Sequence, residues 1–410
     1  MPYDVAIVGT GPAGTATALS LLKAEPQLRG NILLLDKARH PRDKICAGGL
    51  IPHTLDCLDE LDVPLSIPHV AVDRAFVRVP PERQVVCEDG GLCSIIRRNE
   101  FDFLLVRAAQ ERGAEVRQAE KLLNVVREPD GVRLVTDTQT YRARILVGAD
   151  GSGSRVRRRL VGAPPLPLGR AVMCDVPVAD TSWDGFGQQR YDFNFLPVPY
   201  GLQGYLWAFP CLIAGVPHVN IGIYGLGRTR LTNAELRGLL AAEVAALTGR
   251  TDQTRSSPAS CRTAYRMRAF PICGYHPRRA LAARRVVLVG DAAGAEPLMG
   301  EGISFAFEYG KFAAQEIVSA LRGRDVDFSD YTERFARSAA GKKLYRLALT
   351  TRLFYGSAWR VWFGLAARSR RLQSVGLKWY NGVEGWHQRS GWEAVRAVLG
   401  ASSAPPLSQP

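Results

Sequence analysis

The chain has 410 residues, enough for two domains or slightly more and for a core that needs no metal or disulfide to be stable. Hydrophobic residues make up 46% and charged residues 22%, which excludes bulk disorder, collagen and coiled coil. Basic residues outnumber acidic ones by 53 to 39, which gives a net charge of +14.

The first fifty residues have the pattern of a dinucleotide-binding βαβ unit. Apolar runs at 5–8 and 31–35 predict two buried parallel strands, and the residues from about 13 to 24 predict a helix between them. A G-x-G-x-x-G joins the first strand to the helix, so the backbone can approach a pyrophosphate at the helix N-terminus. An aspartate ends the second strand, where a carboxylate can bind ribose hydroxyls. The residues expected to bind the cofactor here are Gly9, Gly11, Pro12, Ala13, Gly14, Asp36 and Lys37.

The rest of the chain alternates between helical and β-rich segments. A helix is expected at 101–113, followed by short strands at 115–119, 121–127, 131–136 and 141–148. Residues 170–227 read as strands and 233–247 as a helix. The longest uncharged stretch, 193–227, is broken by prolines and glycines, so it predicts strands and no membrane span. A further buried strand is expected at 286–289, mostly helix from 300 to 380, and a disordered tail at 401–410.

Two later motifs distinguish FAD from NAD as the cofactor. Asp150 lies in Val-Gly-Ala-Asp-Gly-Ser-Gly, and Gly290 and Asp291 begin Gly-Asp-Ala-Ala-Gly. Together with the first motif they resemble the flavoprotein class typified by para-hydroxybenzoate hydroxylase. The resemblance implies that Asp291 meets the ribityl chain of FAD and that Asp150 lies between FAD and a transient nicotinamide, with Arg98 also contacting FAD. The alternative is that both aspartates simply cap helices, which does not exclude binding.

Three further segments resemble the geranylgeranyl reductase family. They are Tyr-Leu-Trp-Ala-Phe-Pro at 205–210 with Asn-Ile-Gly at 220–222, Lys-Ile-Cys-Ala-Gly-Gly at 44–49, and Gly-Glu-Gly-Ile at 300–303. The resemblance covers most of residues 1–320 and implies an enzyme that reduces carbon–carbon double bonds of polyprenyl chains with FAD. It adds Cys46, Ala47, Gly48, Gly300, Gly302 and Ile303 to the expected cofactor contacts.

The same resemblance predicts Cys46, Tyr205 and Trp207 as catalytic residues. An isolated alkene accepts hydride poorly, so a proton donor beside it matters, and Cys46 and Tyr205 are the candidates. Strand alternation puts Tyr205, Trp207 and Phe209 on one face, where they either wall a substrate tunnel or pack in the core. Cys46 has the corresponding alternative of a small packed hydrophobe.

Residues 342–380 contain nine basic residues, no acidic ones and several aromatic ones. A basic, aromatic, helical segment is typical of binding to a membrane surface. The alternatives are a helix that packs on the body and nucleic-acid binding, which is not expected because no nucleic-acid motif is present.

The predicted fold is α/β. A Rossmann-type FAD domain (1–75, 95–165 and 280–325) is interleaved with an antiparallel β-sheet substrate domain (76–94 and 166–279), followed by a helical basic region (326–400). Eight isolated cysteines and scattered histidines predict no metal centre. The N-terminus lacks a signal-peptide pattern, so the expected location is the cytoplasm, with peripheral membrane association.

The predicted activity is FAD-dependent saturation of a polyprenyl or similar hydrophobic substrate, with NADPH or ferredoxin as the transient electron donor. The alternatives are an aromatic or polyketide monooxygenase, a halogenase-like enzyme and a non-catalytic prenyl carrier. The halogenase alternative is disfavoured because Trp207 lies in a different sequence frame from the halogenase motif.

Overall fold

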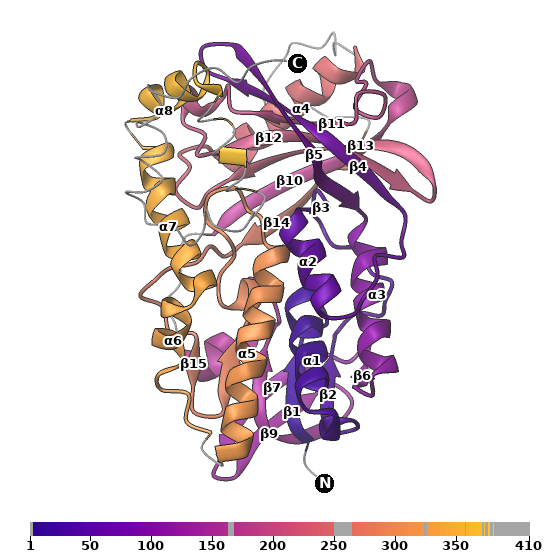
Figure 1. Ribbon diagram of the computed structural model, residues 1–410, viewed down its shortest axis with the longest axis vertical. Coiled ribbons are helices and arrows are strands. Elements are labelled where there is room, and N and C mark those ends of the chain that lie inside the picture. Colours follow the sequence, from indigo (N-terminus) through magenta and orange to yellow (C-terminus); the bar gives the residue numbers. More distant parts are fainter. Residues whose placement is uncertain are drawn as a thin grey trace, which may run out of the picture.

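The computed structural model describes residues 3–162, 168–249, 265–323, 326–356 and 358–370, together with 373, 376, 377 and 380. Its strands form two eight-stranded sheets, one in each half of the molecule in Figure 1. We refer to the sheet that contains the N-terminal strand as sheet A and to the other as sheet B.

Sheet A is the predicted Rossmann-type sheet. Its central strand β1 pairs in parallel with β2 on one side and with β9 on the other. Ala6 and Ile7 are fully buried, as expected for a strand covered on both faces. The strands are β1 (Tyr3–Val8), β2 (Ile32–Leu35), β6 (Glu115–Arg117), β7 (Leu122–Glu128), β8 (Gly131–Thr136), β9 (Thr140–Gly148), β15 (Ala282–Ala283) and β16 (Val286–Leu288).

The helices that accompany sheet A are α1 (Pro12–Ala24), α2 (Pro52–Glu60), α3 (Arg98–Glu111) and α5 (Ile303–Gly323). Helix α1 packs closely along α5, and the two run side by side in Figure 1. A Cβ at Gly310 of α5 would lie 2.8 Å from the backbone nitrogen of Thr17, so glycine is required there for the close contact. This contact brings residues 303–323 against the dinucleotide-binding unit at the start of the chain.

Sheet B is mainly antiparallel, with one parallel pair between β4 and β11. Its strands are β3 (Gly49–Leu50), β4 (His69–Val79), β5 (Arg83–Ile96), β10 (Gly169–Pro177), β11 (Arg190–Asn194), β12 (Gly204–Ile213), β13 (Val216–Gly225) and β14 (Arg268–Ile272). Leu206 and Ala208 share a hydrophobic cluster with helix α4 (Asn233–Thr248). Tyr205, Trp207 and Phe209 belong to the other cluster, which is continuous with sheet A. The predicted alternation along 205–209 is therefore confirmed.

Short helical turns connect these elements: η1 (Pro26–Leu28), η2 (Arg157–Val161), η3 (Val178–Asp180), η4 (Val198–Tyr200) and η6 (Gly290–Ala292). The sequence analysis missed α2 and did not resolve the hairpin of β4 and β5. In that hairpin charged residues such as Asp73 and Arg74 interrupt the apolar pattern. In sheet B, β4 and β5 cover 69–96 and β3 adds 49–50, so the strands of this sheet extend beyond the predicted segment 76–94.

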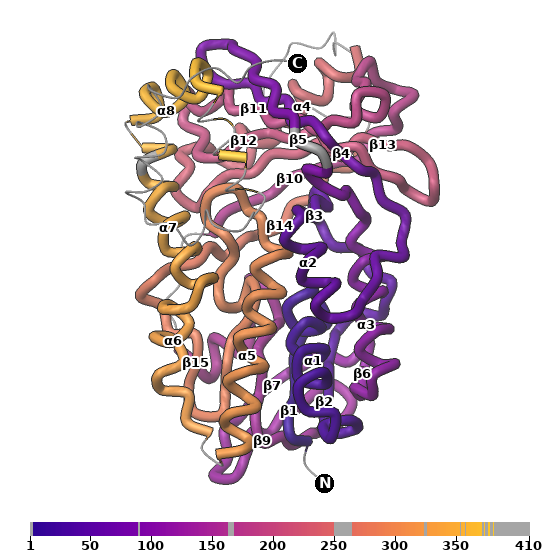
Figure 2. Tube along the Cα trace, viewed as in Figure 1, coloured from indigo at the N-terminus to yellow at the C-terminus, as the bar shows by residue number. Residues whose placement is uncertain are grey.

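Helices α6 (Tyr331–Arg337), α7 (Ala339–Phe354) and α8 (Trp359–Ala366) run along one side of the molecule toward sheet B, as the tube in Figure 2 shows. Phe354 and Phe363 turn inward and contact Phe195, which follows β11 and belongs to the same cluster as Tyr205, with ring centroids 6.0 and 5.3 Å away. Part of the aromatic segment thus packs on the body. Arg371, Lys378 and the tail at 401–410 lie outside the described residues.

Candidate functional site

The turn from β1 into α1 forms a cradle for an anion. A Cβ at Gly9 would lie 2.2 Å from the carbonyl oxygen of Ala149, and one at Gly14 would lie 1.9 Å from the carbonyl oxygen of Gly9. Both glycines therefore permit contacts that no side chain would allow. At Gly11, the helix N-cap, the nearest atom to such a Cβ is 3.7 Å away, and no side chain caps the helix. The open approach to the helix N-terminus at Gly11, Pro12 and Ala13 fits a pyrophosphate.

Asp36 lies at the end of β2, beside this turn. Its carboxylate accepts hydrogen bonds from the backbone nitrogen and hydroxyl of Thr10 at 3.0 and 2.7 Å and from the backbone nitrogen of Ala38 at 2.9 Å. Burial opposes ionisation, but Arg42 and these hydrogen bonds hold the pKa of Asp36 below its ordinary value. An ionised acceptor at this edge fits a ribose hydroxyl. Lys37 follows it and is exposed.

Arg98 begins α3 and is held by a carboxylate that the sequence analysis did not single out. It donates to both oxygens of Asp102 at 2.8 and 3.0 Å, and Arg42 contacts the same carboxylate at 3.2 Å. Burial opposes the charge of Arg98, but Asp102 and Cys46 raise the pKa of its guanidinium above the ordinary value. The i,i+4 spacing of Arg98 and Asp102 on a helix was a signal available in the sequence.

The middle motif serves as a local cap in this structure. Asp150 accepts hydrogen bonds from the Ser154 hydroxyl at 2.5 Å and from the backbone nitrogens of Arg155 and Val156 at 2.6 and 3.1 Å. Burial raises the pKa of Asp150 despite these bonds. The capping alternative therefore holds for Asp150, whose role toward the cofactor stays a prediction, but not for Asp291, which lies inside η6 after the N-cap Val289 and caps no helix.

The late motif touches both earlier ones. The Ser152 hydroxyl donates to Asp291 at 3.3 Å, which joins the middle and late segments. Gly290 has a φ of +58°, and a Cβ there would lie 2.6 Å from the Cβ of Ala13 at the start of α1. The three motifs, far apart in the sequence, converge at the carboxyl ends of the parallel strands, where α/β folds bind ligands.

The motif at 205–222 forms a buried side-chain network on sheet B. The Trp207 indole nitrogen donates to Asn220 at 2.7 Å, and the Asn220 amide donates to Asp175 at 2.6 Å. The indole lies over Gly222, where a Cβ would be 2.1 Å from the ring. This contact explains why the motif pairs tryptophan with Asn-x-Gly on the neighbouring strand.

Tyr205 joins this sheet to the late FAD segment. Its hydroxyl donates to the carbonyl oxygen of Met299, just before Gly300. Burial raises the pKa of Tyr205, so the phenol keeps its proton. Glu301 then caps α5 by accepting from the backbone nitrogens of Ile303 and Ser304 at 3.1 and 3.0 Å, and Gly302 lies between them.

The loop that contains Cys46 lies between the two sheets. Cys46 is a half-buried free thiol that accepts from the backbone nitrogen of Gly48 at 3.4 Å. Gly48 has a φ of +86°, and a Cβ there would lie 2.0 Å from the carbonyl oxygen of Ile96. A Cβ at Gly49 would lie 3.5 Å from the Phe209 ring. With Ala47, the loop is thus fixed against the face that carries Tyr205 and Trp207.

Lys44 in the same loop begins the Lys-Ile-Cys-Ala-Gly-Gly segment, although it was not among the predicted site residues. Its ammonium lies 3.0 Å from the centre of the Phe270 ring. Burial lowers the pKa of Lys44 to about 8, although Asp291 favours its charged form. The neighbouring Asp43 pairs with Arg268 at 3.2 Å, so the loop is bound to β14 at two successive residues.

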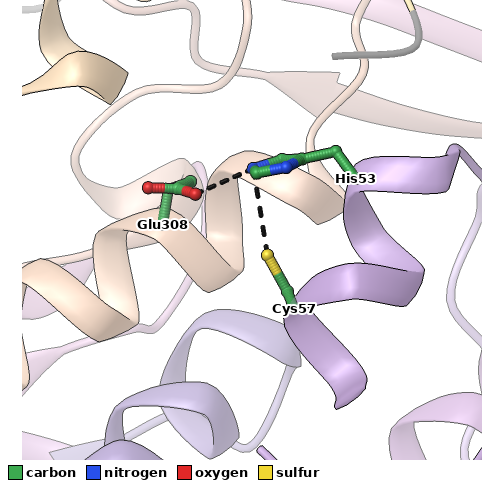
Figure 3. Close-up of side chains that lie close together, drawn as sticks. All are labelled: His53, Cys57 and Glu308. Atoms are coloured by element: carbon green, nitrogen blue, oxygen red, sulfur yellow. Dashed lines mark hydrogen bonds and ion pairs between the residues drawn. The ribbon is translucent and has the colours of Figure 1, made fainter. Parts of the chain in front are cut away.

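Another cluster missed from the sequence joins α2 to α5. The Nε2 atom of His53 lies 2.8 Å from Glu308 and 3.9 Å from the sulfur of Cys57 (Figure 3). The i,i+4 spacing of His53 and Cys57 on α2 was visible in the sequence. Burial raises the pKa of the Cys57 thiol well above its ordinary value, and the hydrogen bond to Glu308 accounts for the position of the imidazole. We interpret this cluster as a structural contact between two helices.

The convergence of three glycine-rich segments on a Rossmann-type sheet, with a second sheet over it, defines an FAD-binding oxidoreductase. Residues 2–169 match the family model described as FAD binding domain. The chain is 31% identical to an uncharacterized protein of Methanosarcina barkeri, covering 87% of this chain and 84% of that one. It is 30% identical to the chloroplastic geranylgeranyl diphosphate reductase of Oryza sativa subsp. japonica, covering 80% and 69%. The chain belongs to the geranylgeranyl reductase family.

The solved structures agree with this fold. A geranylgeranyl bacteriochlorophyll reductase-like protein from Thermoplasma acidophilum superposes with a TM-score of 0.73 at 19% identity, covering 97% of this chain and 96% of that one. A flavin-dependent brominase, in two structures, and a p-nitrophenol 4-monooxygenase share the fold at 16 to 18% identity. Their likeness supports the FAD-binding architecture without choosing among reactions.

Proposed function

We propose that this protein is an FAD-dependent reductase that saturates carbon–carbon double bonds of a polyprenyl substrate. The observation that carries the proposal is the hydrogen bond from Tyr205 to Met299, because it joins the family motif of sheet B to the late FAD segment. The named relatives include a geranylgeranyl diphosphate reductase and a digeranylgeranylglycerophospholipid reductase. Bound reduced FAD supplies a hydride to one carbon of the double bond.

We assign the dinucleotide to the motif residues of sheet A. The residues that would hold the pyrophosphate at the N-terminus of α1 are Gly9, Gly11, Pro12, Ala13 and Gly14, and Asp36 would accept from the ribose. The remaining contacts would come from Lys37, Cys46, Ala47, Gly48, Arg98, Asp150, Gly290, Asp291, Gly300, Gly302 and Ile303. NADPH or ferredoxin is the proposed electron donor.

Cys46 and Tyr205 are the proposed proton-donating pair for the second alkene carbon, with Trp207 setting the position of Tyr205 on the sheet. The Tyr205 proton is held by Met299 in this structure, so its transfer requires that hydrogen bond to exchange.

The exposed face of α7 and α8 supports peripheral binding to a membrane. Tyr345, Leu349, Val361, Trp362 and Leu365 are each between 36% and 60% exposed. Arg352, Arg360, Arg368 and Arg370 are exposed in the same region. Lys343, by contrast, is buried and lies 5.4 Å from the Phe305 ring, so it does not contribute to this face. No helix among the described residues is long and apolar enough to cross a bilayer.

The experiment that tests the activity is anaerobic incubation with dithionite and prenyl substrates, followed by mass spectrometry. A gain of two hydrogens per double bond supports the reductase. An added oxygen that forms only in air identifies a monooxygenase instead, and purified protein without a flavin spectrum identifies a carrier.

A further inference from the structure

Glu296 is a buried carboxylate in the loop between η6 and α5, and the proposed reaction gives it no role. The residue is only 2% exposed. It accepts hydrogen bonds from the backbone nitrogens of Leu298, Met299 and Glu301 at 2.5, 2.6 and 3.2 Å. One carboxylate therefore fixes the backbone of the turn that contains Gly300.

Two tyrosines hold the carbonyl groups of the same turn. Tyr205 donates to the carbonyl oxygen of Met299, whose backbone nitrogen donates to Glu296. The hydroxyl of Tyr355, the residue after α7, donates to the carbonyl oxygen of Leu298 at 3.5 Å. Glu296 and Tyr205 thus bind the two backbone groups of one residue, Met299. Movement of this turn would displace the hydrogen-bond partner of the Tyr205 phenol.

The ionised form of Glu296 is the form that fits these contacts. Its Oε1 atom accepts from Leu298, and its Oε2 atom accepts from Met299 and Glu301, so both oxygens face N–H groups. A proton on either oxygen would place a donor against another donor. Protonation of Glu296 therefore loosens the turn.

The charge of Glu296 changes close to neutral pH. Burial raises its pKa to about 7, although the backbone nitrogens favour the charged form, and Glu301 adds to the rise. Burial lowers the pKa of Lys343 in α7, whereas Glu301 and Glu296 favour its charged form. Burial also raises the pKa values of three phenols, and Glu296 adds to each of these shifts: Tyr205, Tyr224 and Tyr355. Between pH 6 and pH 8, the ionised fraction of a group with a pKa of about 7 rises about tenfold.

We propose that ionised Glu296 is a positioning residue, which holds the Met299 turn in place for the Tyr205 phenol. The same turn leads into Gly300 and Gly302, two of the expected FAD contacts. This inference rests on the proposed function and adds to it a residue that belongs to none of the sequence motifs. It follows that FAD binding and alkene reduction both depend on the ionisation of Glu296.

The first test measures FAD binding by the flavin-free, full-length protein at pH 6 and pH 8. The parent is expected to bind FAD at least threefold more tightly at pH 8. Glu296→Gln cannot ionise, so its affinity is expected to be equal at both pH values and close to that of the parent at pH 6. The matched control is Glu25→Gln, which changes a buried glutamate at the C-terminal end of α1, and it should behave like the parent.

Equal FAD affinity of the parent at the two pH values overturns the proposal, whether or not Glu296→Gln folds. A pH dependence that persists unchanged in Glu296→Gln also overturns it, because another group then causes the effect.

The second test asks whether Glu296 acts through Tyr205. Anaerobic reduction of geranylgeranyl diphosphate by dithionite is measured at pH 8 with saturating FAD for Tyr205→Phe, Glu296→Gln and the double variant. Each single variant is expected to lose at least tenfold in rate, and the double variant should be no slower than Tyr205→Phe. Losses that multiply in the double variant overturn the proposal, because Glu296 then acts independently of Tyr205. If the parent reduces no prenyl substrate, the proposed function is wrong, and the FAD titration still decides whether Glu296 holds the turn.

Discussion

Two glycines of the first FAD motif, Gly11 and Gly14, are needed for different reasons. Gly14 is required by the chain itself, because a Cβ there would meet the carbonyl oxygen of Gly9 at 1.9 Å. A Cβ at Gly11 would make only an ordinary contact, 3.7 Å from the Arg42 side chain, so the chain alone gives no steric reason for glycine at that position. The space at Gly11 is what the proposed pyrophosphate needs.

This contrast predicts different outcomes for two alanine variants. Gly11→Ala should leave the thermal stability of the flavin-free protein unchanged, because the new methyl group would make only an ordinary contact with Arg42. It should weaken FAD binding at least tenfold, because the methyl group would obstruct the proposed pyrophosphate. Gly14→Ala should lower the stability of the flavin-free protein itself. Calorimetry and FAD titration measure the two effects, and full FAD affinity in Gly11→Ala would contradict the assigned pyrophosphate position.

Lys44 gives a prediction about pH. Burial lowers its pKa from 10.5 to about 8, so between pH 8 and 10.5 the unfolded chain binds a proton that the folded protein has lost. The contribution of Lys44 to the free energy of unfolding therefore increases with pH across this window. In Lys44→Met this contribution is absent.

Urea unfolding of parent and Lys44→Met at pH 7 and pH 10 measures the effect. The free energy of unfolding of the parent minus that of Lys44→Met should be larger at pH 10 than at pH 7. A difference that is the same at both values would show that the ammonium is not held in a desolvated position.

At the scale of elements, α7 and α8 have two faces with different partners. Phe354 and Phe363 pack against Phe195, and Phe363 is only 1% exposed, so the inner face is core. The outer face exposes Val361 and Trp362 beside arginines. The two sequence interpretations of this segment, packing and membrane binding, apply to opposite faces of the same helices.

Removal of charge from the outer face should weaken binding to anionic vesicles. Each basic residue near such a surface contributes about 1 kcal/mol. Arg360→Gln, Arg368→Gln and Arg370→Gln combined should therefore reduce vesicle binding by more than tenfold at low salt. Flotation with anionic and neutral vesicles measures this, with Arg107→Gln, Arg158→Gln and Arg237→Gln as the charge-matched control. Equal flotation of both triple variants would rule out this face.

At the scale of the whole molecule, the candidate site is assembled from segments that lie far apart in the chain. The Cys46 loop, the strand with Tyr205 and the turn at Met299 meet where the two sheets face each other. Asp43 and Lys44 fix the loop to β14, which belongs to sheet B. The chemistry therefore depends on the relative position of both sheets.

This assembly predicts the behaviour of Cys46→Ala and Tyr205→Phe. Both variants should retain FAD and its reduction by the donor, yet lose at least tenfold in alkene reduction, about 1.4 kcal/mol of barrier. Cys57→Ala, a buried cysteine on α2, is the matched control and should reduce the alkene like the parent. Parental turnover in both site variants would show that the proton comes from elsewhere.

The sequence by itself determined the dinucleotide-binding unit, the three FAD motifs and the family, because these depend on glycine spacing and on residues close together in the chain. It also determined the alternation of Tyr205, Trp207 and Phe209, since side chains in a strand point to opposite faces in turn. These features are local, so the pattern of residues was sufficient to predict them.

Only the tertiary structure decided which distant residues meet. Arg228, Arg278 and Arg352 come from three segments with no common motif. They line one cavity only because the chain after β13 and the chain after β14 meet α7 there. The pairing of Trp207 with Asn220 and of Tyr205 with Met299 likewise depends on strand register and on the packing of the two sheets. Long-range packing sets these distances, and no spacing within the sequence encodes them.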